Sequence, residues 1–332
     1  MPFARQSAER LQRVLQHEAT RLRGRLAQGG SSDSLSPAAP VVSPTVNVTM
    51  LGPEGPKVFW PAFPPEQYLG QLEEGFQERL GAERAFLELG DCDFYHACVR
   101  RSGEVIDGAW DLRGGEEQYL GEMVLKSKRV LEFGPASGYL TYHMEDQGAH
   151  VTCVDVGYDN SLDVLPVPGS DMREEKIAGI RSVAMVQNSW WYMHRDLDSS
   201  ARMVYGSVYD LPGDLGTFDV STFGCILLHL HDPFSALAQA ARRTREAIVV
   251  TDLVPETIED LDRNLMCFDP VGSSTNLIHW WSLSPGAIVR MLNRLGFERT
   301  TVLLHTQKHH PDHDLDVALT DVPLFTVVGR RA

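Results

Sequence analysis

The residue types best suited to bind a ligand lie in a glycine-containing turn at residues 130–138, VLEFGPASG. Gly134 and Gly138 follow a short apolar run, where glycines let a ligand approach the backbone at the carboxyl end of a strand. A dinucleotide-binding turn has the spacing G-x-G-x-x-G, but Ala136 and Tyr139 occupy its second and third glycine positions here. A Walker A loop has a Lys after its last glycine, whereas this chain has Tyr139. The turn therefore disfavours NAD and ATP as ligands.

Two acidic residues accompany this turn. Glu132 precedes it by two residues, and Asp155 ends the next apolar run, HVTCVD. An acid that ends the second strand of such a unit can accept hydrogen bonds from both hydroxyls of a ribose. An acid beside the glycine turn can hold an ammonium group. A ligand with a ribose and an amino acid, but without phosphate, matches this arrangement.

The surrounding sequence alternates between apolar runs and helical patterns, which indicates a parallel sheet with helices on both faces. A helix between the fourth and fifth strands has Asp232 as its N-cap and Pro233 at its first position. A later helix begins at Ser284 and ends at Gly296, and two β-rich segments without a helix between them follow it. We expect these two segments to form an antiparallel pair at the sheet edge. The expected strands are residues 129–133, 150–155, 202–206, 218–223, 247–252, 299–305 and 322–329.

The turn and its acid resemble motif I of the class I S-adenosylmethionine methyltransferases, whose general form is acid-x-G-x-x-x-G, and the resemblance covers roughly residues 109–330. It implies an α/β, Rossmann-like, doubly wound sheet, mostly parallel, with an antiparallel C-terminal hairpin and a helical N-terminal extension. It also implies S-adenosyl-L-methionine as cofactor. Family members usually have an acid where this chain has Ser207, which leaves a backbone contact at Val208. The implied cofactor residues are Glu132, Gly134, Pro135, Ala136, Ser137, Gly138, Asp155, Ser207, Val208 and Phe223.

A closer subgroup is indicated by GAWDLR at residues 108–113, followed by Tyr119 and Leu120. These residues resemble the tRNA wobble-uridine carboxymethyltransferases and their small-molecule relatives. The carboxylated cofactor of that enzyme needs cations, but this chain has no Lys between Lys57 and Lys126. We therefore expect methyl transfer from ordinary S-adenosylmethionine to a small molecule. An RNA methyltransferase and a non-catalytic binding protein with this fold are the alternatives.

His229 follows the fourth strand, near the expected position of the methyl group. Its ordinary pKa of about 6.5 suits a general base, which predicts that turnover rises through pH ~6–7. The alternative is a histidine that bonds local backbone at a helix entry. Asp252, at the end of the fifth strand, is a second polar candidate.

Aromatic residues gather in segments that we expect to approach the carboxyl edge of the sheet. They could form the walls of an acceptor site, or they could pack in the core. The candidate substrate residues are Trp110, Tyr119, Trp190, Trp191, His279 and Trp280. The loop at residues 305–316 is rich in His and Asp, but its spacing favours a solvated hairpin loop, and we expect no metal site.

Composition limits the partners and the compartment. The chain has 45 acidic and 30 basic residues and a net charge of −15, which disfavours nucleic acid. Its five cysteines include no CxxC, which fits a reducing cytosol and predicts a cytoplasmic protein. No apolar run approaches the ~20 residues of a membrane span, and no secretory leader is recognised. The sequence leaves the oligomeric state open.

We expect three parts along the chain. Residues 1–65 should form an N-terminal helix and a linker rich in Pro, Gly and Ser. Residues 66–127 should form a helical lid or substrate segment, and residues 128–332 the methyltransferase domain.

Overall fold

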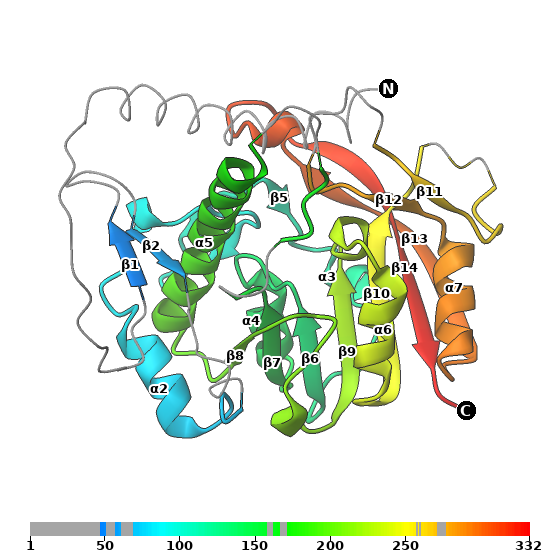
Figure 1. Cartoon of the computed structure of the whole chain (residues 1–332), viewed down its shortest axis with the longest axis horizontal. Coiled ribbons are helices and arrows are strands. Elements are labelled where there is room, and N and C mark those ends of the chain that lie inside the picture. The colour runs from blue at the N-terminus through cyan, green and yellow to red at the C-terminus, as the bar shows by residue number, and fades with distance from the viewer. Residues whose placement is uncertain are drawn as a thin grey trace.

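A large mixed sheet organises the protein in this computed structural model (Figure 1). The structure describes residues 47–50, 57–60, 69–157, 162–166, 171–256, 258, 260–270 and 277–332. Eight strands lie in the order β5-β13-β14-β10-β9-β6-β7-β8. Their bounds are β5 (Trp110–Asp111), β6 (Arg129–Phe133), β7 (His150–Asp155), β8 (Arg202–Tyr205), β9 (Phe218–Gly224), β10 (Thr244–Leu253), β13 (Arg299–His309) and β14 (Thr320–Arg330).

The sheet is mostly parallel, as the sequence predicts. Five adjacent strands run parallel to one another: β8, β7, β6, β9 and β10. The next strand, β14, pairs antiparallel with β10 and with β13. The predicted C-terminal antiparallel hairpin is confirmed: β14 lies between β10 and β13, and only the short β5 lies beyond the pair. The two-residue strand β5 adds to the far side of β13. The α/β, Rossmann-like fold class is therefore confirmed.

Alternate side chains along the strands pack into two hydrophobic cores, one on each face of the sheet. Val130 packs with the helices α4 (Tyr139–Asp146) and α5 (Met172–Leu197), whereas Leu131 and Phe133 pack with α6 (Pro233–Ala241) and α7 (Pro285–Arg294). The latter two helices begin at the predicted residues. The side chains of Asp232 and Ser284 accept hydrogen bonds from backbone N–H groups three residues later, at 3.0 and 3.1 Å.

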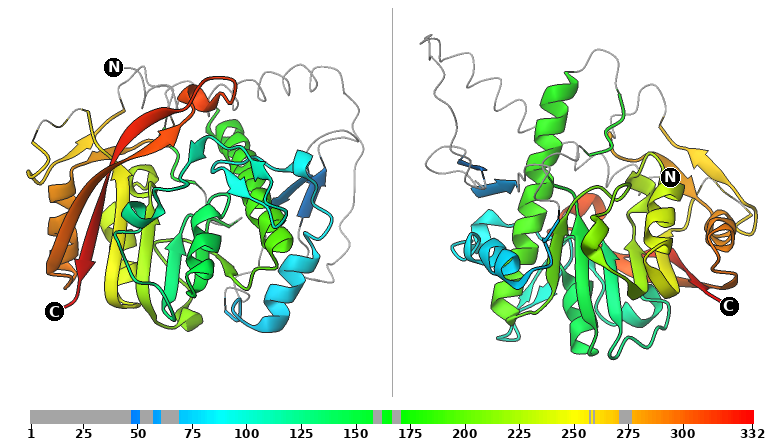
Figure 2. Two further views of the ribbon diagram at one scale, coloured as in Figure 1. Left: turned by 180° about the vertical axis from the view of Figure 1, so that it is seen from behind. Right: turned by 60° about the horizontal axis from the view of Figure 1, so that its bottom comes forward.

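The segment before the first parallel strand is less helical than expected. It contains α2 (Glu74–Ala82), the short α3 (Glu116–Tyr119), and the two-residue strands β3 (Cys98–Val99) and β4 (Val105–Ile106). Its connections run over the face that carries α4 and α5. The α2 helix lies at the opposite end of the sheet from the β13–β14 hairpin (Figures 1 and 2).

The remaining elements are short. The strands β1 (Asn47–Met50) and β2 (Lys57–Trp60) pair antiparallel, within a segment that we expected to be a helix and linker. The predicted helix over residues 1–27 and the linker over 29–44 lie outside the described residues. The strands β11 (Met266–Phe268) and β12 (Trp281–Leu283) form a second hairpin. Single 3-10 turns occur at Leu89–Asp91, Gly213–Leu215, Leu227–His229 and Pro311–His313. Within the described residues, no helix has both the length and the apolar character to cross a membrane.

Candidate active site

The glycine turn joins β6 to α4 in a conformation that needs glycine. Gly134 and Gly138 have φ angles of 65° and 86°, in the left-handed region that other residues rarely adopt. A Cβ atom at Gly138 would lie 2.6 Å from the ring of Tyr142 and 2.7 Å from that of Trp190. A Cβ atom at Gly134 would lie 2.8 Å from Cδ1 of Ile226. The turn therefore packs closely against the neighbouring elements, and this packing is possible only because the two glycines have no Cβ atoms.

Glu132 lies beneath this turn as a buried carboxyl group. Thr141 Oγ1 donates a hydrogen bond of 2.5 Å to its Oε2, and Cys153 Sγ donates one of 3.4 Å to the same oxygen. Burial raises the pKa of Glu132 to about 7, which these two hydrogen bonds only partly offset. A cation placed beside this carboxyl would favour its ionised form. That Glu132 holds an ammonium group stays a prediction.

Asp155 ends the neighbouring strand β7. Its carboxylate accepts a hydrogen bond of 2.7 Å from the backbone N–H of Val156, and burial raises its pKa to about 6. The next strand ends beside it, because the N–H of Gly206 donates to the Asp155 carbonyl at 2.9 Å. There Ser207 Oγ accepts from the N–H of Tyr209 at 3.2 Å, so this hydroxyl stabilises its own turn. Val208 packs against the second core.

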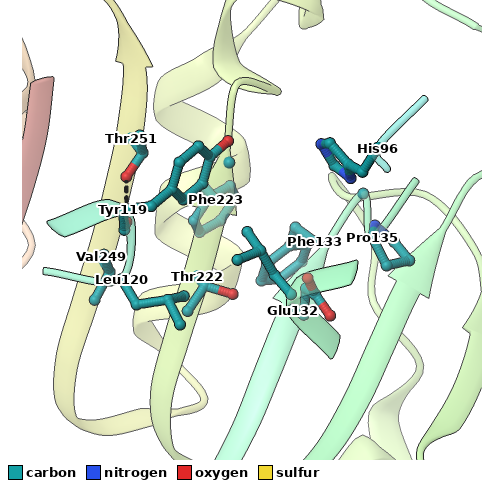
Figure 3. A pocket seen from close by; sticks show the side chains of 13 residues that line it. His96, Tyr119, Leu120, Glu132, Phe133, Pro135, Thr222, Phe223, Val249 and Thr251 are labelled. Atoms are coloured by element: carbon teal, nitrogen blue, oxygen red, sulfur yellow. Dashed lines mark hydrogen bonds between the residues drawn. The ribbon is translucent and has the colours of Figure 1, made fainter. Parts of the chain in front are cut away.

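A pocket opens between the ends of β6 and β9 and the segment that precedes β6 (Figure 3). Its empty space, including the part open to solvent, is about 360 Å³. The predicted residues Glu132, Gly134, Pro135, Phe223 and Tyr119 line it. The other lining residues were not predicted as site residues: His96, Leu120, Phe133, Leu140, Thr222, Gly224, Val249 and Thr251. Asp155, His229 and the other aromatic candidates are not among the lining residues.

Two of these additional residues carry buried polar atoms without a partner. Nδ1 of His96 and Oγ1 of Thr222 have no hydrogen-bond partner among the described residues, although only 9% and 6% of these residues are exposed. Burial lowers the pKa of His96 to about 4, so its imidazole is neutral near pH ~7 and can accept a hydrogen bond. An unpaired buried polar atom costs ~1–3 kcal/mol, which a ligand with suitable donors would recover. Figure 3 shows Glu132 and Thr222 at the lower side of the pocket in that view, with His96 and Tyr119 on opposite sides.

The backbone of His96 is fixed against the glycine turn. Ser137 Oγ accepts hydrogen bonds from the N–H groups of Tyr95 and His96, at 2.7 and 3.3 Å. The chain also passes tightly over Gly108, where a Cβ atom would lie 2.3 Å from the carbonyl carbon of His96. The predicted site residue Ser137 thus connects the preceding segment to the cofactor turn. No sequence motif surrounds His96, so the sequence offered no signal for it.

The structure gives His229 a different environment from the expected one. Its Nδ1 lies 2.8 Å from the carbonyl oxygen of Ile278, which accepts the imidazole proton. Burial, aided by the neighbouring His279, lowers the pKa of His229 to about 4, although the hydrogen bond to Ile278 opposes this shift. The expectation of a base that titrates near pH ~6–7 is therefore wrong, because this imidazole is already neutral above pH ~5. His229 adopts the backbone-bonded arrangement that was the alternative.

Asp252 is the other polar residue at this edge. Its Oδ1 accepts from the N–H of Leu253 at 2.8 Å, while Oδ2 is buried without a partner among the described residues. Burial raises the pKa of Asp252 to about 7. Desolvation raises the pKa values of Cys225 and Tyr119, and the negative charge of Asp252 raises them further. Asp252 is thus an acid that can change its charge near neutral pH at the end of β10.

The predicted aromatic walls are mostly core. Trp190 and Trp191 are 0% and 3% exposed and pack between α5 and the sheet. Their indole N–H groups donate to Thr141 Oγ1 at 3.3 Å and to the hydroxyl of Tyr205 at 2.8 Å. The structure therefore gives both a packing role in place of the expected substrate role. Neither ring is among the residues that line the pocket.

Of the other candidates, Trp110 lies in β5, whereas His279 and Trp280 are consecutive residues before β12. Trp110 is buried against His309, with 4.4 Å between ring centroids. Trp280 donates to the carbonyl of Asp163 at 2.8 Å, and His279 Nε2 lies 2.9 Å from a carboxylate oxygen of Asp269. Tyr119 alone of the substrate candidates lines the pocket.

The histidine-rich loop is not fully solvated, since His309 is only 2% exposed. In the part of the chain that the structure describes, no three His, Cys, Asp or Glu residues are placed to hold a metal ion.

Comparisons with known proteins give structural likeness only. No family model matches the chain, and no curated protein matches it. The N-terminal domain of EvdMO1, with SAH bound, is 17% identical and has a TM-score of 0.43, covering 77% of this chain and 97% of its own. Magnesium protoporphyrin IX methyltransferase from Synechocystis PCC 6803, with SAH bound, is 12% identical with a TM-score of 0.39, covering 67% and 82%.

A third solved structure is the Burkholderia thailandensis 1,6-didemethyltoxoflavin-N1-methyltransferase, with its substrate and S-adenosylhomocysteine bound. It is 16% identical with a TM-score of 0.40, covering 66% of this chain and 78% of its own. These sequence identities and TM-scores are low, so the function is inferred below from the chain's own sheet order and site residues. The chain's own parallel strands, its antiparallel β14 inserted between β10 and β13, and its glycine turn form the α/β, Rossmann-like fold that the sequence resemblance implies.

Proposed function

We propose that this protein is an enzyme that transfers a methyl group from S-adenosyl-L-methionine to a small-molecule acceptor. One observation carries the proposal. The buried carboxyl group of Glu132 and the half-buried carboxyl group of Asp155 lie near the ends of adjacent parallel strands, beside the tight Gly134–Gly138 turn, and desolvation raises the pKa of each. A phosphate would be repelled there, whereas a cation and a pair of hydroxyl donors would be attracted.

The residues present fit the cofactor. Glu132, Thr222 and His96 offer three hydrogen-bond acceptors to its ammonium group, and two of them have no other partner among the described residues. Asp155 would accept hydrogen bonds from the ribose hydroxyls, and the methionine part would lie beside Gly134 and Pro135, which line the pocket. When bound, the cofactor supplies an electrophilic methyl group on a sulfonium. We propose that residues 128–332 bind it and that the preceding segment covers it.

The chain's own part in the reaction is to align the reactants and to exclude water. Tyr119 lies over Gly224, where a Cβ atom would be 2.8 Å from the tyrosine hydroxyl, and this hydroxyl donates to Cys225 Sγ at 3.6 Å. These groups and the apolar rings of Phe133 and Phe223, stacked 4.3 Å apart, give the pocket a mainly apolar lining. We propose that alignment provides most of the rate. That His229 acts as a base stays a prediction. Its Nε2 would have to accept the proton, because Nδ1 already carries one.

The acceptor class is a proposal supported by composition. A net charge of −15 disfavours RNA, and the covered pocket favours a small molecule. The five cysteines are all free, which supports our proposal of a cytoplasmic location.

Calorimetry tests the cofactor, with S-adenosylmethionine, S-adenosylhomocysteine and NAD titrated separately. We expect binding of the first two, weakened by Asp155→Ala because two hydroxyl donors lose a charged acceptor worth ~1.5–3 kcal/mol per bond. Binding of NAD alone would contradict the proposal. Labelled methyl transfer to bulk tRNA, with none to a small-molecule extract, would contradict its acceptor class.

A further inference from the structure

The strand β13 has an open outer edge. It pairs with β14 along all 11 of its residues, but on its other side β5 pairs only with Lys308 and His309. Among the described residues, no strand pairs with residues 299–307 on that side. Such an edge presents unpaired N–H and C=O groups in a row, which favours the addition of another strand. In Figure 1, β13 lies toward the end of the sheet away from α2.

The side chains of this edge lack the usual protection against pairing. Proteins commonly guard open edges with lysines, prolines, bulges or inward-pointing charges. Residues 300–307, TTVLLHTQ, contain no Lys, Arg, Asp, Glu or Pro. Val302 and Leu304 point to one face of the strand and are 44% and 65% exposed. This edge therefore combines free backbone groups with exposed apolar side chains.

The sequence of the edge is complementary to itself. In an antiparallel pair of identical strands, a two-fold axis passes through one residue, and the others face each other symmetrically. With the axis at Leu303, each Val302 faces Leu304 of the second copy, so the exposed apolar side chains cover one another. No like charges face each other in this register. The remaining opposed pairs are Arg299 with Gln307, Thr300 with Thr306, and Thr301 with His305.

We propose that the protein forms a two-fold homodimer through antiparallel pairing of β13 with β13 of a second copy, centred on Leu303. The pairing joins two eight-stranded sheets into one continuous sheet. Both partners contribute the same surface, as a two-fold interface requires. This assembly is independent of the proposed methyl transfer.

A cysteine substitution tests the register directly. Residues facing each other in an antiparallel pair have Cα atoms about 4.5–5.5 Å apart, within the range of about 4.4–6.8 Å for disulfides. Leu303→Cys should therefore give a disulfide-linked dimer under mild oxidation, seen on a non-reducing gel. Thr301→Cys is the matched control, because this residue faces His305 of the second copy and not itself. Equal cross-linking of the two variants, or none in either, would overturn the proposal.

Sedimentation tests the assembly without covalent links. The wild-type mass should rise from monomer to dimer with concentration, and Leu304→Lys should weaken association by at least about tenfold, because it places charges in the apolar contact. Val124→Lys changes an exposed apolar residue elsewhere, 79% exposed, and should leave association unchanged. A wild-type protein that stays monomeric at its highest soluble concentration would refute the dimer. If Leu304→Lys unfolds, which circular dichroism would reveal, the cysteine pair still decides.

Discussion

Replacing Glu132 with Gln should change stability and cofactor binding in opposite directions. The carboxyl has a pKa of about 7 in the folded protein against an ordinary value of 4.5, because burial disfavours its charge. Between these two pH values the folded chain binds more protons than the unfolded chain, so stability falls as pH rises through this window. A difference of ~2.5 pKa units corresponds to ~3 kcal/mol, lost in full above pH ~7.

The Glu132→Gln variant carries no charge at this position and escapes this loss. Its amide oxygen can still accept the hydrogen bonds from Thr141 and Cys153. Without ligand, Glu132→Gln should therefore be more stable than the wild type at pH ~8, by up to ~3 kcal/mol, and about equal below pH ~4.5. At a few degrees per kcal/mol for a domain of this size, calorimetric unfolding should show a rise of roughly 5 °C or more.

Cofactor binding should respond in the other direction. The variant loses a charged hydrogen bond to the ammonium group, worth ~1.5–3 kcal/mol, so affinity for S-adenosylmethionine should fall about tenfold or more. In the wild type, affinity should rise with pH through ~7 as Glu132 ionises. Glu117→Gln alters an exposed carboxyl and should change neither property. A variant that is less stable at pH ~8, or that binds the cofactor as tightly as the wild type, would refute the reasoning.

Three further outcomes are expected from the site geometry. Gly138→Ala should destabilise the fold by more than ~1–3 kcal/mol in thermal unfolding, because the cost of the left-handed backbone adds to the clash of the new Cβ atom. Gly103→Ala, with a φ of 85° and open space around the residue, should show the backbone cost alone. Equal losses in the two variants would contradict the tight packing of the turn. His96→Ala should weaken S-adenosylmethionine binding by ~0.5–1.5 kcal/mol in calorimetry by removing a neutral acceptor, and unchanged affinity would exclude that contact. His229→Ala should leave the shape of the pH–rate profile above pH ~5 unchanged, because the pKa of His229 is about 4. A wild-type inflection near pH ~6–7 that disappears only in this variant would show that His229 is the general base.

Features that depend on a few neighbouring residues were predictable from the sequence. The glycine turn, the acids that end β6 and β7, and the caps at Asp232 and Ser284 are set by local backbone conformation and short-range hydrogen bonds. The alternation of strands and helices is also a local pattern, and it predicted the parallel sheet correctly. The position of β14 between β10 and β13 was not predictable, because strand order depends on pairing between distant segments.

The identity of the pocket residues was decided by tertiary structure. His96 lies 41 residues from Ser137 in sequence, and tertiary contacts, including their hydrogen bond, bring it to the glycine turn. Trp190 and His229 carry side chains suited to a site, but packing directs one into the core and gives the other a carbonyl partner 49 residues away. The sequence alone determined the glycine turn and its two acids, because their geometry is local. Only the tertiary structure decided which distant side chains line the pocket and how burial sets their charge, since both depend on neighbours that the chain brings together by folding.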